Sequence, residues 1–243
     1  FIGAILEPGA ADIDVDQLCQ AYTRQLRANG GEIRCGAEVS AIARDDAYWT
    51  IETRAGTFNA GLVVNAAGAW ADPIAEMAGV ARLGLIPHRR SAAIVEFERN
   101  LDRDGPMHGN YGETWYAKPE GDWLMVSLAD ETPMEPCDAW AEDLDIATAI
   151  DNFQQSVDTG EVERMVRSWA GLRTFAADRI PVVGFDAKVP DFYWLAGQGG
   201  SGIHAGPALA EQAAAEILKR EVAEWAQVDT AYSAQVSPTR LAS

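Results

Sequence analysis

Basic residues are scarce in this sequence: 19 Lys and Arg stand against 37 Asp and Glu, which gives a formal net charge of −18. A nucleic-acid-binding protein gathers Lys and Arg into a stripe or patch that neutralises phosphates, and no such stripe occurs here. Nucleic acid is therefore excluded as a partner. The acidic surplus is typical of a solvated surface and does not by itself predict a cationic substrate.

Cysteine is also rare. Cys19, Cys35 and Cys137 form no CxxC pair and have no histidine at metal-ligand spacing. We therefore expect neither a disulfide framework nor a metal site. No apolar run is long enough to cross a bilayer, and no signal peptide opens the sequence. The expected location is the cytoplasm, with peripheral contact to the inner membrane left open.

The first 80 residues predict a helix, a strand, a β-meander, a strand and a short helix, in that order. Leu18, Tyr22 and Leu26 recur every four residues between acidic residues and Asn29-Gly30, which indicates a helix with both ends marked. We expect strands over residues 32–35, 38–44, 48–53, 57–60 and 61–65, the last one buried and parallel, and then a helix that ends at Gly79.

From residue 83 the pattern changes to β-rich segments with aromatic residues. A helix is predicted over residues 144–157, and strands over 169–184 and 192–196. A long helix is expected from the glycine-rich turn at 197–202 to about residue 220. The polar tail after residue 228 is expected to be irregular.

Two blocks place small residues between a strand and a helix. Residues 62–70 read Leu-Val-Val-Asn-Ala-Ala-Gly-Ala-Trp, and residues 192–204 read Phe-Tyr-Trp-Leu-Ala-Gly-Gln-Gly-Gly-Ser-Gly-Ile-His. Small residues let a ligand or another backbone approach closely, and the helix that follows offers N–H groups to an anion. A plain turn also explains the first block, whereas the second has more glycine than a turn needs. The lysine of a phosphate loop is absent.

These blocks and the meander together resemble the D-amino-acid oxidase/sarcosine oxidase (DAO) family of FAD enzymes. Residues 87–91, 169–173 and 177–184 extend the resemblance, which is closest to the bacterial D-amino-acid (D-arginine) dehydrogenases. The implied fold is α/β: a Rossmann-like FAD-binding domain, incomplete and with a β-meander, plus an α+β substrate domain with an antiparallel sheet. The implied division is FAD-binding domain over 1–82, substrate-binding domain over 83–165, and a return to the FAD-binding domain over 166–243, with the flavin-contacting strand and the C-terminal helix.

The resemblance implies which residues bind substrate. Arg90 and Arg173 match the two arginines that hold the substrate carboxylate, a role that suits the planar guanidinium. Read without the resemblance, each could be a solvated surface charge. Tyr116 matches a tyrosine that closes over the substrate. Met107, Gly200 and His204 match positions that line it.

The resemblance also implies a cofactor site for FAD. The matching positions lie along the adenine, near the pyrophosphate and at the pyrimidine edge of the flavin. They are Val39, Asn65, Ala66, Ala67, Gly68, Trp70, Gly171, Gly199, Gly200, Ser201, Gly202, Ile203 and His204. Covalent attachment to a cysteine near the C-terminus is not expected, because the last cysteine is Cys137, so FAD should be bound non-covalently.

The implied reaction is oxidative deamination of a D-amino acid. A hydride passes from Cα to flavin N5, and the imine product hydrolyses to a 2-oxo acid and ammonia. Oxidation of a 2-hydroxy acid, or of sarcosine or glycine, would use the same two arginines. Residues 106–112, Ser201 and His204 differ from the D-arginine pattern, which leaves the side-chain preference open. The electron acceptor (a quinone or another) and the oligomeric state also stay open.

One part of the family pattern is missing. No GxGxxG follows a strand, and residues 1–6 read as a strand already under way. We therefore expect a fragment of a longer protein. The alternative from another class is a non-catalytic or truncated chain that binds no FAD alone. Because a missing central strand leaves apolar surface and backbone groups uncovered, we expect the isolated chain to be poorly soluble or free of flavin.

Overall fold

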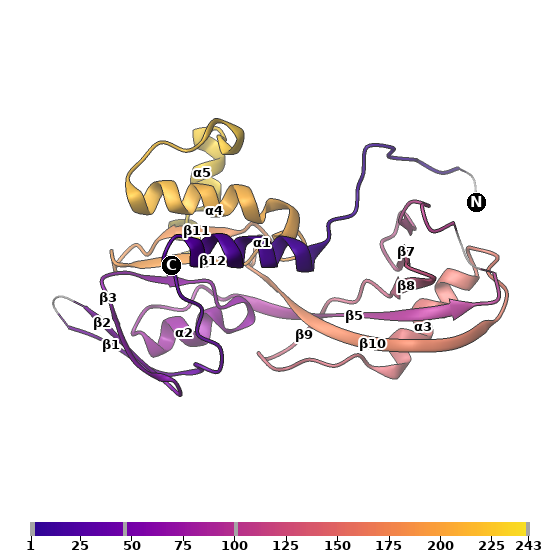
Figure 1. The fold of residues 1–243 in the computed structure, drawn as a ribbon, viewed down its shortest axis with the longest axis horizontal. Helices are drawn as coiled ribbons and strands as arrows, with labels where there is room; N and C mark the ends of the chain where they lie inside the picture. The colour runs from indigo at the N-terminus through magenta and orange to yellow at the C-terminus, as the bar shows by residue number, and fades with distance from the viewer. Residues whose placement is uncertain (1–2, 46–47, 100–101, 242–243) are drawn as a thin grey trace.

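The computed structural model describes residues 3–45, 48–99 and 102–241. Figure 1 shows an elongated molecule with two lobes: one contains the helices α1, α2, α4 and α5, and the other contains β7, β8 and α3. The long strands β5 (Ile86–Phe97) and β10 (Val162–Phe175) run between the lobes and pair antiparallel along their length. They carry the chain from the first lobe into the second and back.

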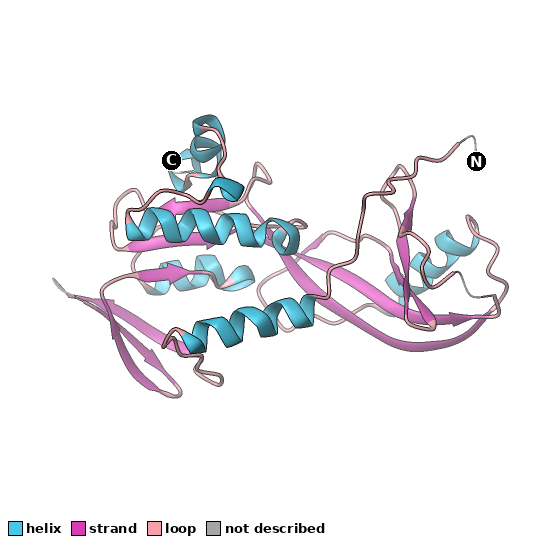
Figure 2. Cartoon of the chain, turned by 45° about the horizontal axis from the view of Figure 1, so that its top comes forward, coloured by secondary structure: helices cyan, strands magenta, loops and turns pink. Residues whose placement is uncertain are grey.

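Helix α1 (Val15–Ala28) begins and ends where the sequence predicts. Asp14 caps it by accepting a hydrogen bond from the backbone N–H of Gln17 at 2.9 Å, and Gly30 follows its end with a φ of +82°. Its apolar face is not covered: no residue of α1 is buried, and Tyr22 and Leu26 are 50% and 44% exposed. Figure 2 shows the helix lying along one side of the first lobe.

The β-meander is confirmed. Strands β1 (Val39–Arg44), β2 (Trp49–Thr53) and β3 (Gly56–Ala60) form an antiparallel sheet in the order β1-β2-β3. The turn between β2 and β3 uses Gly56 at a φ of +122°, a conformation that glycine adopts at little cost. Trp49 is fully buried and anchors the meander to the rest of the lobe.

A second sheet of the first lobe has the order β11-β12-β4. Strand β4 (Val63–Asn65) runs parallel to β12 (Phe192–Ala196), as predicted, and β11 (Val182–Phe185) is antiparallel to β12. Strand β4 is shorter than predicted and lies at the edge of the described sheet. The prediction that it is buried is wrong for Val64, which is 43% exposed. The short helices η1 (Gly68–Trp70) and α2 (Ala71–Met77) follow β4, and the long helix α4 (Gly202–Leu218) follows the glycine-rich turn.

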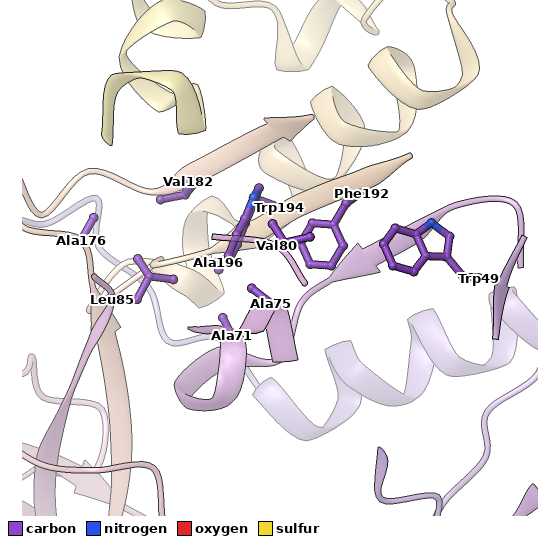
Figure 3. Close-up of a cluster of buried hydrophobic side chains, with 10 residues drawn as sticks. All are labelled: Trp49, Ala71, Ala75, Val80, Leu85, Ala176, Val182, Phe192, Trp194 and Ala196. Carbon is purple, nitrogen blue, oxygen red and sulfur yellow. The ribbon is translucent and has the colours of Figure 1, made fainter. Parts of the chain in front are cut away.

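The core of the first lobe joins segments that are far apart in the sequence. Figure 3 shows Trp49 next to Phe192 and Trp194 near Ala75 of α2, all within one buried cluster. Burial of such large aromatic side chains contributes about 1.5–3 kcal/mol each. The residues that precede β5 and those that follow β10 therefore fold as one unit.

The second lobe is an antiparallel sheet with a helix on one face. Its order is β10-β5-β8-β7-β6, with β9 also paired to β5. The helix α3 (Asp143–Gln154) covers one face of the sheet, where its Phe153 packs against Phe97 and Trp115. The remaining strands are β6 (His108–Gly109), β7 (Tyr116–Glu120), β8 (Trp123–Ser127) and β9 (Thr132–Pro133). Together the lobes confirm the expected α/β fold with an antiparallel second sheet.

Three local predictions are wrong. Residues 3–6 and 32–35 are not strands: neither segment pairs with a described strand, and Ile5 and Ile33 are 99% and 41% exposed. Residues 1–2 lie outside the described residues. The tail after residue 228 is not irregular, since it forms α5 (Thr230–Val236) and η3 (Pro238–Leu241); a short helix, η2 (Glu224–Ala226), precedes it. Val236 and Pro238 are buried, so tertiary packing orders this polar segment.

The domain boundaries at residues 82/83 and 165/166 stay a prediction. Residue 165 lies inside β10, which stays paired with β5 on both sides of it, although the register shifts between Val162 and Arg164 and between Met165 and Arg167.

Candidate functional site

The face of the second sheet opposite α3 brings together the three predicted substrate residues. Side chains alternate along a strand, so Arg90 lies on the face opposite Ala93, Val95 and Phe97 of the α3-covered core. The register sets Gly171 of β10 opposite Arg90, and Arg173 lies two residues further along the same face. Tyr116 of β7 also faces this side, and the Arg90 guanidinium carbon lies 6.0 Å from the centre of its ring.

Arg90 is held in place from the loop that follows β8. Its Nε donates a hydrogen bond to the backbone oxygen of Asp130 at 2.8 Å, and its Nη2 donates to Glu131 at 3.2 Å. Only 14% of its side chain is exposed. The carboxylate of Asp130 accepts bonds from the backbone N–H and the hydroxyl of Ser91, which fixes the loop against β5. The guanidinium is therefore ordered before any ligand arrives.

Arg173 is different, because none of the described carboxylates lies within ion-pair distance of it. Burial lowers the pKa of its guanidinium, and the positive charge of Arg90 lowers that pKa further. A half-buried cation beside a second cation is costly unless an anion balances it. In a chain with a net charge of −18, this local positive excess predicts a binding site for an anion.

The glycine-rich turn passes directly over this site. A Cβ at Gly200 would lie 3.3 Å from Nη1 of Arg173. Gly199 has a φ of +53°, and a Cβ there would overlap the ring of Phe175. Its backbone N–H donates to the carbonyl oxygen of Thr174 at 2.9 Å. Glycine is needed here because the turn rests on β10 with no room for a side chain.

A groove of about 480 Å³ gathers another part of the predicted site. Its walls include Ala66, Ala67, Gly68 and Trp70 from the first small-residue block and Gly171 from β10. A Cβ at Gly68 or Gly171 would have no heavy atom within 4 Å, so the backbone at both positions is open to the groove. Open backbone of this kind allows a ligand to approach closely.

Asn65 has a structural use. It is 2% exposed, its Nδ2 donates to the backbone oxygen of Ala71 at 2.7 Å, and its Oδ1 accepts from the N–H of Ala67 at 3.3 Å. The side chain therefore shapes the turn between β4 and α2. Its contribution to the groove is through the position of residues 66–68.

The remaining predicted residues do not line the groove. Ser201, Gly202, Ile203 and His204 lie at the start of α4, where no side chain caps the helix, and all but Gly202 are exposed there. The uncapped N–H groups and the helix dipole leave this end suited to negative charge. Val39 lies on the meander, and Met107 is 64% exposed in the loop before β6. The structure thus gathers two clusters, Arg90, Arg173 and Tyr116 on the sheet face and residues 66–70 with Gly171 in the groove, and places residues 201–204, Val39 and Met107 in neither.

Several residues near these clusters were missed from the sequence. Asp130 and Glu131 contact Arg90, Arg179 bonds to Glu131, and Cys137 and Asp138 line the groove. They lie in loops or turns between strands, where no periodicity marks them. Only the proximity of Asp130-Glu131 to the end of a predicted strand could have drawn attention to them.

A comparison with family models identifies the chain. Residues 1–216 match the DAO model, described as FAD dependent oxidoreductase. The chain belongs to this family. Among curated proteins it is similar to human mitochondrial dimethylglycine dehydrogenase, with 26% identity over 225 residues, which cover 84% of this chain and 26% of that protein. It is also similar to hydrogen cyanide synthase subunit HcnC of Pseudomonas aeruginosa, with 27% identity over 192 residues, which cover 77% of this chain and 44% of that protein.

Solved structures share the fold. Glycine oxidase from Geobacillus kaustophilus superimposes with a TM-score of 0.74 at 22% identity and covers 92% of this chain. L-Proline dehydrogenase from P. horikoshii superimposes with a TM-score of 0.76 at 20% identity and covers 93% of it. The chain spans 57% and 59% of these two structures, and between about a quarter and a half of the curated relatives named above.

The residues of the chain fit FAD, the cofactor of the family. The groove beside Gly68 and Gly171 is open to backbone contact, and α4 presents an uncapped N-terminus. Across the described ranges no His, Cys, Asp or Glu side chains gather in a group of three that could hold a metal ion. No helix in the part of the chain that the structure describes is both long and apolar enough to span a bilayer.

Proposed function

We propose that the protein that contains this chain oxidises small amino acids with FAD, and that arginines of this chain bind the substrate carboxylate. The observation that carries the proposal is Arg173, a half-buried cation with no described carboxylate partner, on the same sheet face as Arg90. In the proposed role both guanidinium groups bind the carboxylate and fix its position and rotation. Tyr116 then bounds the substrate on the side of β7.

FAD is proposed to lie non-covalently along the groove formed by Ala66, Ala67, Gly68, Trp70 and Gly171. Gly199 to His204, at the start of α4, would contact its flavin end, and Val39 would lie along the adenine. When bound, FAD accepts the hydride that leaves the substrate Cα. The start of α4 favours negative charge at that end of the site, and the two arginines orient the Cα–H bond by holding the carboxylate.

The first substrate class to test is D-amino acids, which the resemblance to bacterial D-amino-acid dehydrogenases suggests. One amino acid, one acceptor and water would give a 2-oxo acid, ammonia and the reduced acceptor. The second candidate is an N-methylated glycine. It is favoured by the names of relatives: dimethylglycine dehydrogenase in human and sarcosine dehydrogenase in mouse. The same two arginines would hold its carboxylate.

The experiment is a flavin spectrum of the full-length gene product before and after anaerobic addition of substrates. The panel contains D- and L-amino acids, sarcosine, dimethylglycine and 2-hydroxy acids. Bleaching by D-isomers alone supports D-amino-acid oxidation, and bleaching by the N-methylated glycines alone moves the proposal to them. Bleaching only by 2-hydroxy acids would overturn oxidation of amino acids. Re-addition of oxygen or a quinone then identifies the acceptor. A cytoplasmic location is proposed with this function.

A further inference from the structure

Glu131 lies between two arginines. Its Oε1 accepts from Nη2 of Arg90 at 3.2 Å, and both of its oxygens accept from Nη2 of Arg179 at 3.0 Å. The hydrogen bond from Arg179 is the largest cause that lowers the pKa of the Glu131 carboxyl, and the charge of Arg90 adds to the effect. Glu131 is therefore a carboxylate at neutral pH, and it already occupies one of the two arginines assigned to the substrate.

Stacking on Phe175 holds Arg179 in a position from which it can hydrogen-bond to Glu131. Its guanidinium carbon lies 4.0 Å from the centre of the Phe175 ring, and its backbone has a φ of +62° in the turn after β10. A stacked guanidinium is restrained in orientation by the ring in addition to its hydrogen bonds with Glu131. Phe175 in turn lies against Gly199, which connects this pair to the proposed substrate site.

We propose that Glu131 is an internal competitor of the substrate carboxylate, bound to Arg90 in the free site and withdrawn to Arg179 when a carboxylate binds. This inference rests on the proposed function, in which Arg90 and Arg173 hold that carboxylate. Arg179 receives Glu131 without a new contact, because both oxygens already bond to it. Glu131 thus sets how tightly the site binds a carboxylate, and Arg179 sets how strongly Glu131 competes.

The proposal predicts changes of opposite sign for the two partners. Glu131→Gln removes the competing charge and tightens carboxylate binding, whereas Arg179→Gln releases Glu131 towards Arg90 and weakens it. Each change should be about two- to fivefold, the range for a partly exposed ion pair. In the double variant the effect of Arg179→Gln should disappear, because no competing carboxylate is left to redirect.

The measurement is isothermal titration calorimetry of acetate and benzoate into the full-length, FAD-loaded protein. Wild type, the two single variants and the double variant form one thermodynamic cycle. Glu135→Gln is the matched control, since it removes the same charge from an exposed position four residues along the same chain segment. Arg173→Met reports whether the titrated carboxylate binds at the proposed site. Neither acid oxidises under these conditions, so the readout is independent of turnover.

The outcomes separate the two proposals. Tighter binding in Glu131→Gln, weaker binding in Arg179→Gln and loss of the second effect in the double variant support the competition. Equal tightening in Glu131→Gln and Glu135→Gln overturns it, because that pattern indicates an effect of the net charge of the protein and not of the contact between Glu131 and Arg90. Unchanged or weaker binding in Glu131→Gln, with affinity still dependent on Arg173, overturns the competition and leaves the proposed function standing. Carboxylate binding that does not depend on Arg173 overturns both.

Discussion

Arg90 and Arg173 lie on one face of two paired strands, offset by two residues, and only Arg90 has a carboxylate partner among the described residues. The loop after β8 neutralises the first arginine, while burial and the charge of Arg90 depress the pKa of the second. Arg173, a half-buried cation with no carboxylate at ion-pair distance, is the strongest physical sign of an anion site in the part of the chain that the structure describes. We therefore expect the two arginines to respond differently to substitution.

Arg173→Lys should weaken carboxylate binding more than Arg90→Lys does. Lysine keeps the charge but loses the planar fork, which removes one charged hydrogen bond worth about 1.5–3 kcal/mol, roughly 10- to 150-fold in affinity. Arg90 already shares its donors with Asp130 and Glu131, so its replacement should cost less. The check is titration of acetate, with Arg167→Lys on the same strand as control. Equal losses at both positions would contradict the asymmetry.

Gly199→Ala should destabilise the fold. The left-handed φ of +53° and the overlap with the Phe175 ring act together, with an expected loss of about 1–3 kcal/mol in unfolding free energy. Urea denaturation measures it. A variant as stable as wild type would show that the turn can move away from β10.

Gly171→Ala should separate cofactor binding from folding. The added Cβ meets no heavy atom within 4 Å, so the unfolding free energy should not fall. If FAD lies along the groove, the methyl group would intrude on it and raise the dissociation constant for FAD. Flavin release is followed by fluorescence, and Gly199→Ala provides the comparison in which stability is lost. Unaltered FAD binding in Gly171→Ala would contradict the proposed path of the cofactor.

Stability should depend on pH through Glu211. A hydrogen bond from Arg220, and then one from the N–H of Ala223, lower the pKa of its carboxyl from 4.5 to about 2. A depressed folded-state pKa stabilises the fold above pH 4.5, and this contribution is lost as the pH falls towards 2. Glu211→Gln should therefore lower the urea midpoint at pH 7 and match wild type near pH 2. Glu221→Gln is the control, because it removes one negative charge nearby without removing the hydrogen bonds of Glu211. A difference between wild type and Glu211→Gln that stays the same at both pH values would contradict this linkage.

The isolated chain of residues 1–243 should purify without stoichiometric FAD or associate into larger species. Helix α1 has no buried residue, and Tyr22, Leu26 and Val64 are each more than two-fifths exposed. Exposed apolar surface of this kind promotes association unless another part of the protein or a partner covers it. Flavin absorbance and light scattering check the expectation. A yellow, monomeric preparation would contradict it.

Local signals in the sequence predicted much of the fold. The acidic residues and Asn29-Gly30 that mark the ends of α1, the short runs at 48–53 and 57–60, and the apolar run at 192–196 act within a few residues, and each gives the expected element. The segment 32–35 has the composition of a strand, but a strand requires a neighbour that local sequence does not supply. The prediction of an irregular tail was wrong for the opposite reason: packing against the first lobe orders a segment whose own sequence does not favour a helix.

The candidate site was only partly predictable. Arg90, Arg173 and Tyr116 were proposed from the resemblance, and the register of the four strands β10, β5, β8 and β7 brings them to one face. Glu131 and Arg179 were not proposed, because their meeting depends on how two distant loops approach each other. Asn65 is informative in another way, since its side chain completes a turn that the sequence showed only as a run of small residues.

The most direct test of the account compares an amino acid with the amine that lacks its carboxylate. The reducing substrate identified by the panel and its decarboxylated amine are each added anaerobically to the full-length flavoprotein, as wild type and as Arg173→Met. We predict that the amino acid bleaches the wild-type flavin, that the amine does not, and that Arg173→Met needs at least about tenfold more substrate. Equal bleaching by the amine, or wild-type behaviour of Arg173→Met, would contradict the claim that this chain holds the substrate by its carboxylate.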